Sequence, residues 1–166
     1  MTYQTGITPA GTTEEPQGFT HSPVSREFSR LLVALRTAVD AELDTLDIDV
    51  FDIAFKDWVA GAEHAWRVVA ELVQKTMRHK PMRDEDDELR HVAALIGFST
   101  YLEHSEDCHA YNLLVRDYSP IFPCGAETAT GRHTGQMITI AREWFRTLDI
   151  AVLGRTPTPE AQAAAM

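Results

Sequence analysis

Residues 51–73 read FDIAFKDWVAGAEHAWRVVAELV, and this stretch decides the fold class. When each residue turns about 100° around a helix axis, its apolar side chains stay within a sector of roughly 160°. These side chains are Phe51, Phe55, Trp58, Val59, Ala62, Ala65, Trp66, Val69, Leu72 and Val73. The pattern predicts a long amphipathic helix over 50–79, with Asp47 or Asp49 as the N-cap and a turn around Pro81 after it.

Three further stretches show the same periodicity. Ser22 and Pro23 form an N-cap and first-turn pair, which begins a helix predicted over 23–46. The acidic run 84–88 favours a helix N-terminus and begins a helix predicted over 84–118. We expect that helix to continue through the polar stretch 104–108, the alternative being a bend near Ser105. The last helix is predicted over 134–153, after a loop that contains Gly131 and Gly135. Its predicted buried face consists of Met137, Ile140, Ala141, Trp144, Leu148 and Ala151.

Four such helices predict an all-α fold, an up-and-down bundle of long amphipathic helices spanning residues 22–154. The predicted core includes Phe28, Leu35, Phe55, Trp58, Trp66, Val69, Ile96 and Trp144. Residues 1–21 are rich in Thr, Gly and Pro and predict an extended arm, and residues 155–166 predict a C-terminal tail of similar character.

Composition limits the function classes to consider. The chain has 166 residues, 44% of them hydrophobic, and a formal net charge of -10. Such a charge opposes capture of nucleic acid or anionic membrane by the surface as a whole. The sequence has no apolar run of membrane-spanning length and no basic and apolar segment typical of a secretory signal, so we expect a cytoplasmic protein. Two cysteines are too few to indicate a disulfide framework.

Glu-x-x-His, a motif of di-iron bundles, occurs as Glu88 with His91 and as Glu106 with His109. Both copies fall on the one helix predicted over 84–118. Their glutamates are 18 residues apart, about 27 Å along a continuous helix. One metal centre cannot use both pairs, so we expect neither pair to belong to a di-iron site.

Soft metal ligands gather in a second set, Cys108, His109, Cys124 and His133. Its spacing matches no common zinc module. No nucleophile, base and orienting group can be assigned together either. We therefore expect no catalytic site and no cofactor, and keep a metal-binding bundle, with zinc or iron, as the alternative function.

A basic elbow follows the helix predicted over 50–79 and consists of Lys75, Arg78, Lys80 and Arg83. Arg26, Arg30, Arg142 and Arg146, on the polar faces of the first and last predicted helices, are candidates to extend it. Such a cluster could contact phosphates of a nucleic-acid backbone. Cations at a helix C-terminus are also explained by the helix dipole alone.

In architecture, a bundle with two arms resembles the small helical subunits of multi-subunit ribonucleoproteins such as CRISPR effector complexes, and also helical accessory proteins of phage particles. This resemblance implies a non-catalytic subunit or adaptor that binds protein partners or itself. We expect the arm to contact the partner through its large apolar residues, Tyr3, Ile7 and Phe19.

Overall fold

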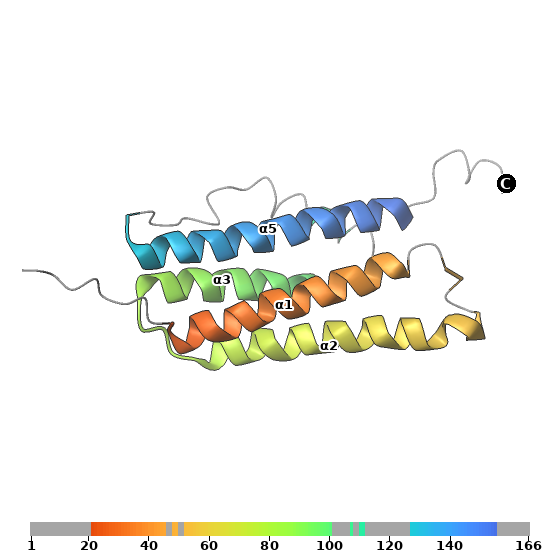
Figure 1. Ribbon diagram of the computed structural model, residues 1–166, viewed down its shortest axis with the longest axis horizontal. Coiled ribbons are helices and arrows are strands. Elements are labelled where there is room, and N and C mark those ends of the chain that lie inside the picture. Colours follow the sequence, from red (N-terminus) through yellow and green to blue (C-terminus); the bar gives the residue numbers. More distant parts are fainter. Residues whose placement is uncertain are drawn as a thin grey trace, which may run out of the picture.

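The computed structural model of the protein describes residues 21–45, 48–49, 52–100, 107, 110–111 and 127–155. Within these ranges the regular structure is helical and no strand occurs, so the all-α prediction is confirmed. The elements are α1 (Pro23–Asp44), the 3-10 turn η1 (Ile53–Phe55), α2 (Lys56–Arg78), α3 (Asp84–Ser99) and α5 (Ala129–Arg155). In Figure 1 the axes of α1, α2, α3 and α5 run roughly along one direction.

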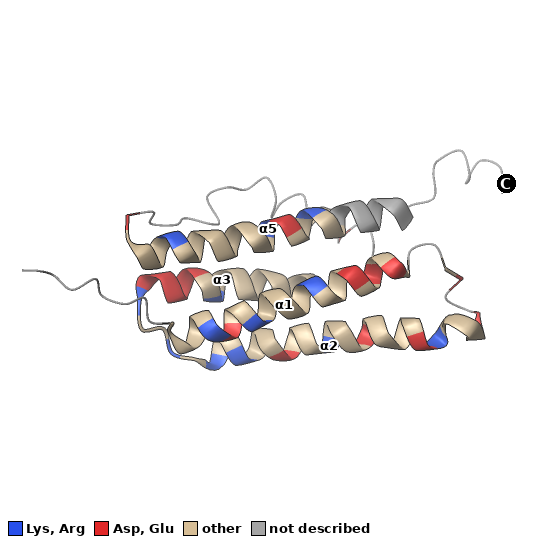
Figure 2. Ribbon diagram, in the orientation of Figure 1, with Lys and Arg blue, Asp and Glu red and all other residues tan. Residues whose placement is uncertain are grey.

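The sequence signals for the starts of α1 and α3 are confirmed. Ser22 caps α1, its Oγ accepting a hydrogen bond of 3.0 Å from the backbone N–H of Ser25, and Pro23 is the first helical residue. The first turn of α3 holds the acidic run that begins at Asp84. Figure 2 shows this acidic turn at the same end of the bundle as the basic end of α2.

Helix α2 begins later than predicted, at Lys56 rather than at residue 50. Asp52 caps the 3-10 turn η1 that precedes α2, its carboxylate accepting a hydrogen bond of 2.9 Å from the N–H of Ala54. The N-cap position of α2 itself is Phe55, which makes no side-chain cap hydrogen bond, so the predicted cap at Asp49 is wrong, and Asp47 lies outside the described residues.

Helix α3 ends at Ser99, so the prediction of an unbroken helix over 84–118 is wrong. The Tyr111 hydroxyl donates a hydrogen bond of 2.9 Å to the carbonyl of Leu95, and the rings of Tyr111 and Phe98 are 5.0 Å apart. In a continuous helix residues 95 and 111 would be about 24 Å apart. The hydroxyls of Ser99 and Thr100 each donate at 2.7 Å to a carbonyl of the last turn, which satisfies acceptors that a helix end leaves without a partner.

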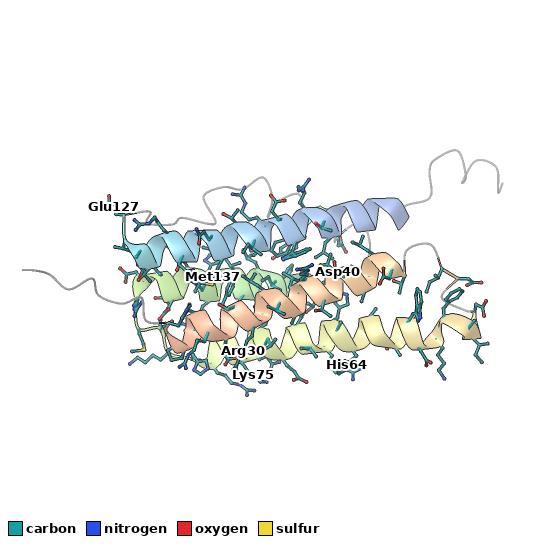
Figure 3. All side chains as sticks on the ribbon, viewed as in Figure 1. Arg30, Asp40, His64, Lys75, Glu127 and Met137 are labelled. Carbon is teal, nitrogen blue, oxygen red and sulfur yellow. The ribbon has the colours of Figure 1, made fainter. Side chains whose placement is uncertain are left out.

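Helices α1, α3 and α5 all begin at the same end of the bundle. The rings of His21 and His133 are 5.4 Å apart, and an Arg83 Nη1 lies 3.5 Å from the Oγ1 of Thr130. In Figure 3, Glu127 at the start of α5 lies toward the same end as Arg30, whereas Asp40 lies nearer the other. Helix α5 is therefore parallel to α3, and the strict up-and-down order predicted for the bundle fails at this helix.

Helix α5 also begins earlier than predicted, at Ala129. The Thr128 Oγ1 accepts a hydrogen bond of 2.9 Å from the N–H of Gly131, which satisfies a first-turn donor. Gly131 and Gly135, predicted to lie in a loop, are thus part of the helix.

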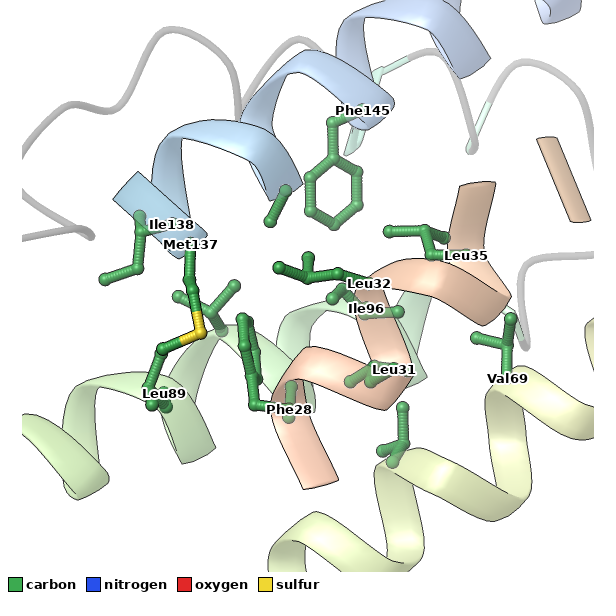
Figure 4. Packing of buried hydrophobic residues seen from close by; sticks show 14 of the residues in the cluster. Phe28, Leu31, Leu32, Leu35, Val69, Leu89, Ile96, Met137, Ile138 and Phe145 are labelled. Carbon is green, nitrogen blue, oxygen red and sulfur yellow. The ribbon is translucent and has the colours of Figure 1, made fainter. Parts of the chain in front are cut away.

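The core lies between α1, α3, α5 and the C-terminal part of α2 (Figure 4). Among the predicted core residues, Phe28, Leu35, Val69 and Ile96 are buried, and Trp66 and Trp144 are partly buried against the cluster. On α5 the buried side chains are Met137, Ile138, Ala141, Phe145 and Leu148. Ile140 is 46% exposed, so its predicted burial is wrong: the buried face passes through Ile138 and Phe145 instead.

Helices α2 and α3 approach each other closely at Gly97. A Cβ atom at this position would lie 2.8 Å from the Cγ1 of Val73, which is too near for van der Waals contact. A side chain at residue 97 therefore requires the Val73 side chain to rotate or one helix to move. Gly97 allows α2 and α3 to pack this closely.

Candidate interaction surface at the free end of α2

The register between α1 and α2 shows which part of α2 extends past the end of α1. The indole N–H of Trp66 donates a hydrogen bond of 3.3 Å to the Glu42 carboxylate. The two helices are antiparallel, so Asp44, the last residue of α1, is level with about residue 64 of α2. The part of α2 before that point lies beyond the end of α1.

Helix α3 ends even further from the start of α2. An Arg90 guanidinium N–H donates to the carbonyl of Met77 at 3.3 Å, and Gly97 lies against Val73. Ser99 is therefore level with about residue 70 of α2. The first two turns of α2 extend past the ends of both neighbours, as Figure 1 shows at the end of α2 farthest from α3.

The core-facing side of α2 continues along this extension, and no described helix covers it there. Trp58 is 57% exposed, Phe55 and Val59 are half-buried, and Ile53 of the preceding turn is 85% exposed. The rings of Phe55 and Trp58 meet edge to face at 6.1 Å. We call these four residues the free tip. The predicted core positions of Phe55 and Trp58 are wrong because α1 and α3 are too short to cover them.

Acidic residues lie at the same end of the bundle as the free tip. Asp44, Asp49, Asp52 and Asp57 are all exposed. Lys56 is the only Lys or Arg in the sequence between residues 44 and 62. The tip is thus an apolar patch with a negative rim, which fits a partner surface that combines apolar and basic side chains.

The basic elbow lies at the opposite end of α2. Lys75, Arg78 and Lys80 are exposed, whereas Arg83 is half-buried and reaches Thr130 of α5. The structure therefore brings three of the four predicted cations to an open surface. Two apolar side chains lie among them: Met77 is 37% exposed and Met82 is 72% exposed.

Helix α1 adds basic residues to this end. By the register set at Trp66 and Glu42, Arg30 is level with Arg78. Figure 3 shows Arg30 and Lys75 toward the same end of the two helices. Arg26 and Arg30 are both exposed, and Arg30 pairs with Glu27 at 2.8 Å.

Neither of the metal sites considered from the sequence has a full set of ligands among the described residues. Glu88 is half-buried, and burial, followed by the charges of Glu85 and Asp84, raises the pKa of its carboxyl, while His91 is exposed. Glu106, Cys108, His109 and Cys124 lie outside the described residues. Over the described ranges, no group of three or more His, Cys, Asp or Glu side chains is placed to hold a metal ion.

His133, the described member of the predicted zinc set, lies beside His21 at the start of α5. Burial, followed by the charge of His21, lowers the pKa of the His133 imidazole.

The predicted arm contacts Tyr3, Ile7 and Phe19 lie outside the described residues. In the part of the chain that is described, no helix combines the length and the apolar character needed to cross a membrane.

Sequence reasoning missed Ile53, Met77 and Met82. A signal existed for Ile53, because it lies on the polar side of the predicted helix, far from the stripe of Phe55 and Trp58. Large apolar residues at predicted polar positions are candidates for contacts with a partner.

Comparison with known proteins adds no further assignment: no family model matches this chain, and neither a curated protein nor a solved structure matches it.

Proposed function

We propose that this chain is a non-catalytic helical subunit or adaptor of a larger cytoplasmic assembly. The observation that carries the proposal is the free tip: Phe55, Trp58 and Val59 extend the core-facing side past the ends of α1 and α3, and Ile53 of the preceding turn is 85% exposed. Aromatic side chains exposed in this way are typical of the central part of protein interfaces. A partner that covers the tip would remove Trp58 and Ile53 from water.

The proposal requires no catalytic residue, cofactor or metal. It draws on the resemblance of the architecture to helical subunits of nucleoprotein and phage assemblies. The arm residues Tyr3, Ile7 and Phe19 are proposed as additional partner contacts.

The experiment that tests the proposal is isolation of the tagged chain from its native host, followed by native mass measurement. We expect the chain in a complex of defined stoichiometry. The variant Trp58→Glu should lose the partner, while Val33→Glu, at a position 68% exposed on α1, should keep it. A monodisperse monomer without a partner in every preparation would end this proposal.

A nucleic-acid contact through the basic elbow is a second candidate. The observation that favours it is the presence of Arg26 and Arg30 at the same end of the bundle as Lys75, Arg78 and Lys80. Binding would follow the backbone charge and weaken steeply with salt, because neutralised phosphates release counterions. The double variant Arg78→Glu, Lys80→Glu should abolish retardation of labelled nucleic acid in gels, and Arg67→Glu in the middle of α2 should not.

A further inference from the structure

The two ends of α2 differ in charge but share exposed apolar residues. The free tip joins Ile53 and Trp58 to a rim of aspartates, and the basic elbow joins Met77 and Met82 to exposed cations. Exposed carboxylates of Asp84 and Asp87 also lie at the elbow end, so the complementarity rests on the cations Lys75, Arg78 and Lys80 against the aspartates of the tip. The ends lie about 33 Å apart along one helix, so they cannot meet within one chain.

We infer that copies of this chain associate head to tail, the basic elbow of one copy docking on the free tip of the next. This inference rests on the proposed function and names a second copy as the partner. Met77 and Met82 of one copy then cover Trp58 and Ile53 of the other.

Charge decides between this arrangement and a symmetric one. If two free tips met about a twofold axis, Asp44, Asp49, Asp52 and Asp57 would be brought near the same four residues of the second copy. Like charges brought together oppose association. In the head-to-tail arrangement the same aspartates meet Lys75, Arg78 and Lys80.

Helix polarity favours the same choice. The N-terminal end of one α2, with its positive partial charge, faces the C-terminal end of the next, with its negative partial charge. Each copy inside a row of subunits uses one tip and one elbow. An unused tip remains at one end of the row and an unused elbow at the other, so further copies can add. Such a heterologous contact produces rings or open filaments instead of closed dimers.

The test uses two variants of the full chain that block one surface each. The tip variant carries Ile53→Glu and Trp58→Glu, and the elbow variant carries Arg78→Glu and Lys80→Glu. All four positions are exposed, so helical circular dichroism should be unchanged. The control, Val33→Glu with Arg67→Glu, changes exposed positions outside both surfaces.

Sedimentation velocity over a range of protein concentrations at low salt measures the outcome. We expect wild type and control to associate as concentration rises. The affinity of each blocked variant for itself should be at least about 100-fold lower. An equimolar mixture of the two variants should form a complex of two chains and nothing larger, because one intact tip meets one intact elbow. Added salt should dissociate the wild-type assembly.

Three results would overturn the inference. The first is a wild-type chain that stays monomeric up to its solubility limit. The second is an elbow variant that dimerises like the wild type, which would assign a symmetric contact. The third is association that disappears after nuclease treatment, which would assign the elbow to nucleic acid. A monomeric wild type that still enters a host complex would refute self-association alone and leave the subunit proposal standing.

Discussion

The Ser22 hydroxyl donates a hydrogen bond of 2.5 Å to the carboxylate of Asp86, which is only 2% exposed. The second carboxylate oxygen of Asp86 accepts a hydrogen bond of 2.9 Å from the backbone N–H of Met82. One side chain thus joins the N-cap of α1 to the α2–α3 connection, and it fixes the elbow that carries the basic residues. A buried carboxylate with these partners is expected to be important for stability.

The variant Asp86→Ala should lower the free energy of unfolding by about 1.5 to 3 kcal/mol, because a buried acceptor is lost, and the buried Ser22 hydroxyl and the Met82 N–H both lose their partner. Urea denaturation measures the change. Asp87→Ala is the matched control: its exposed carboxylate pairs with Arg90 at 3.3 Å and should contribute less than about 1 kcal/mol. Equal losses for the two variants would show that the buried bridge is unimportant.

Glycine replacements should act in opposite directions at two helical positions. Gly97→Ala places a methyl group against Val73 and should destabilise the fold by about 1 to 3 kcal/mol. Gly61→Ala meets no atom within 4 Å and should stabilise it by up to about 1 kcal/mol through helix propensity. Thermal unfolding of the two variants checks both signs, and a stabilised Gly97→Ala would mean that α2 and α3 are not held at this distance.

Two tryptophans on α2 should respond differently to truncation. Trp66 packs against the core and its indole donates to Glu42, so Trp66→Ala should cost about 3 kcal/mol of stability. Trp58→Ala should cost less than about 1 kcal/mol in the isolated chain, because the side chain is mainly exposed. If Trp58→Ala proves the more destabilising variant in urea denaturation, the free tip is covered within one chain.

Stability should depend on pH through His133, whose pKa in the folded chain is lower than its ordinary 6.5. The unfolded chain then binds the proton more readily than the folded chain does, so protonation opposes folding. Stability should be lowest below the folded pKa, rise with pH between that pKa and 6.5, and stay level above. Urea midpoints measured across this window should show the rise in wild type and a smaller rise in His133→Gln. An identical pH profile in the variant would exclude this histidine as the cause.

The helix starts at Ser22 and Asp84 could be predicted, because capping and charge act within a few residues of the chain. The end of α3 could not, since the hydrogen bond from Tyr111 to Leu95 joins residues 16 positions apart and leaves no periodic signal. The same limit explains Trp58: its place on the apolar stripe was clear, but its burial depends on how far α1 and α3 extend beside it. The cations of the basic elbow were evident from the sequence. That the elbow and the free tip lie at opposite ends of the bundle could be derived only from the register of the helices in the structure.

The most direct measurement of the central claim is hydroxyl-radical footprinting of Trp58, with Trp66 as the internal reference. It compares the dilute isolated chain with the chain in its assembled state, whether that is a host complex or the concentrated protein. The account predicts that the oxidation rate of Trp58 falls several-fold on assembly while that of the half-buried Trp66 stays nearly constant. A Trp58 that is oxidised equally fast in every state would contradict the claim that the free end of α2 is a partner-binding surface.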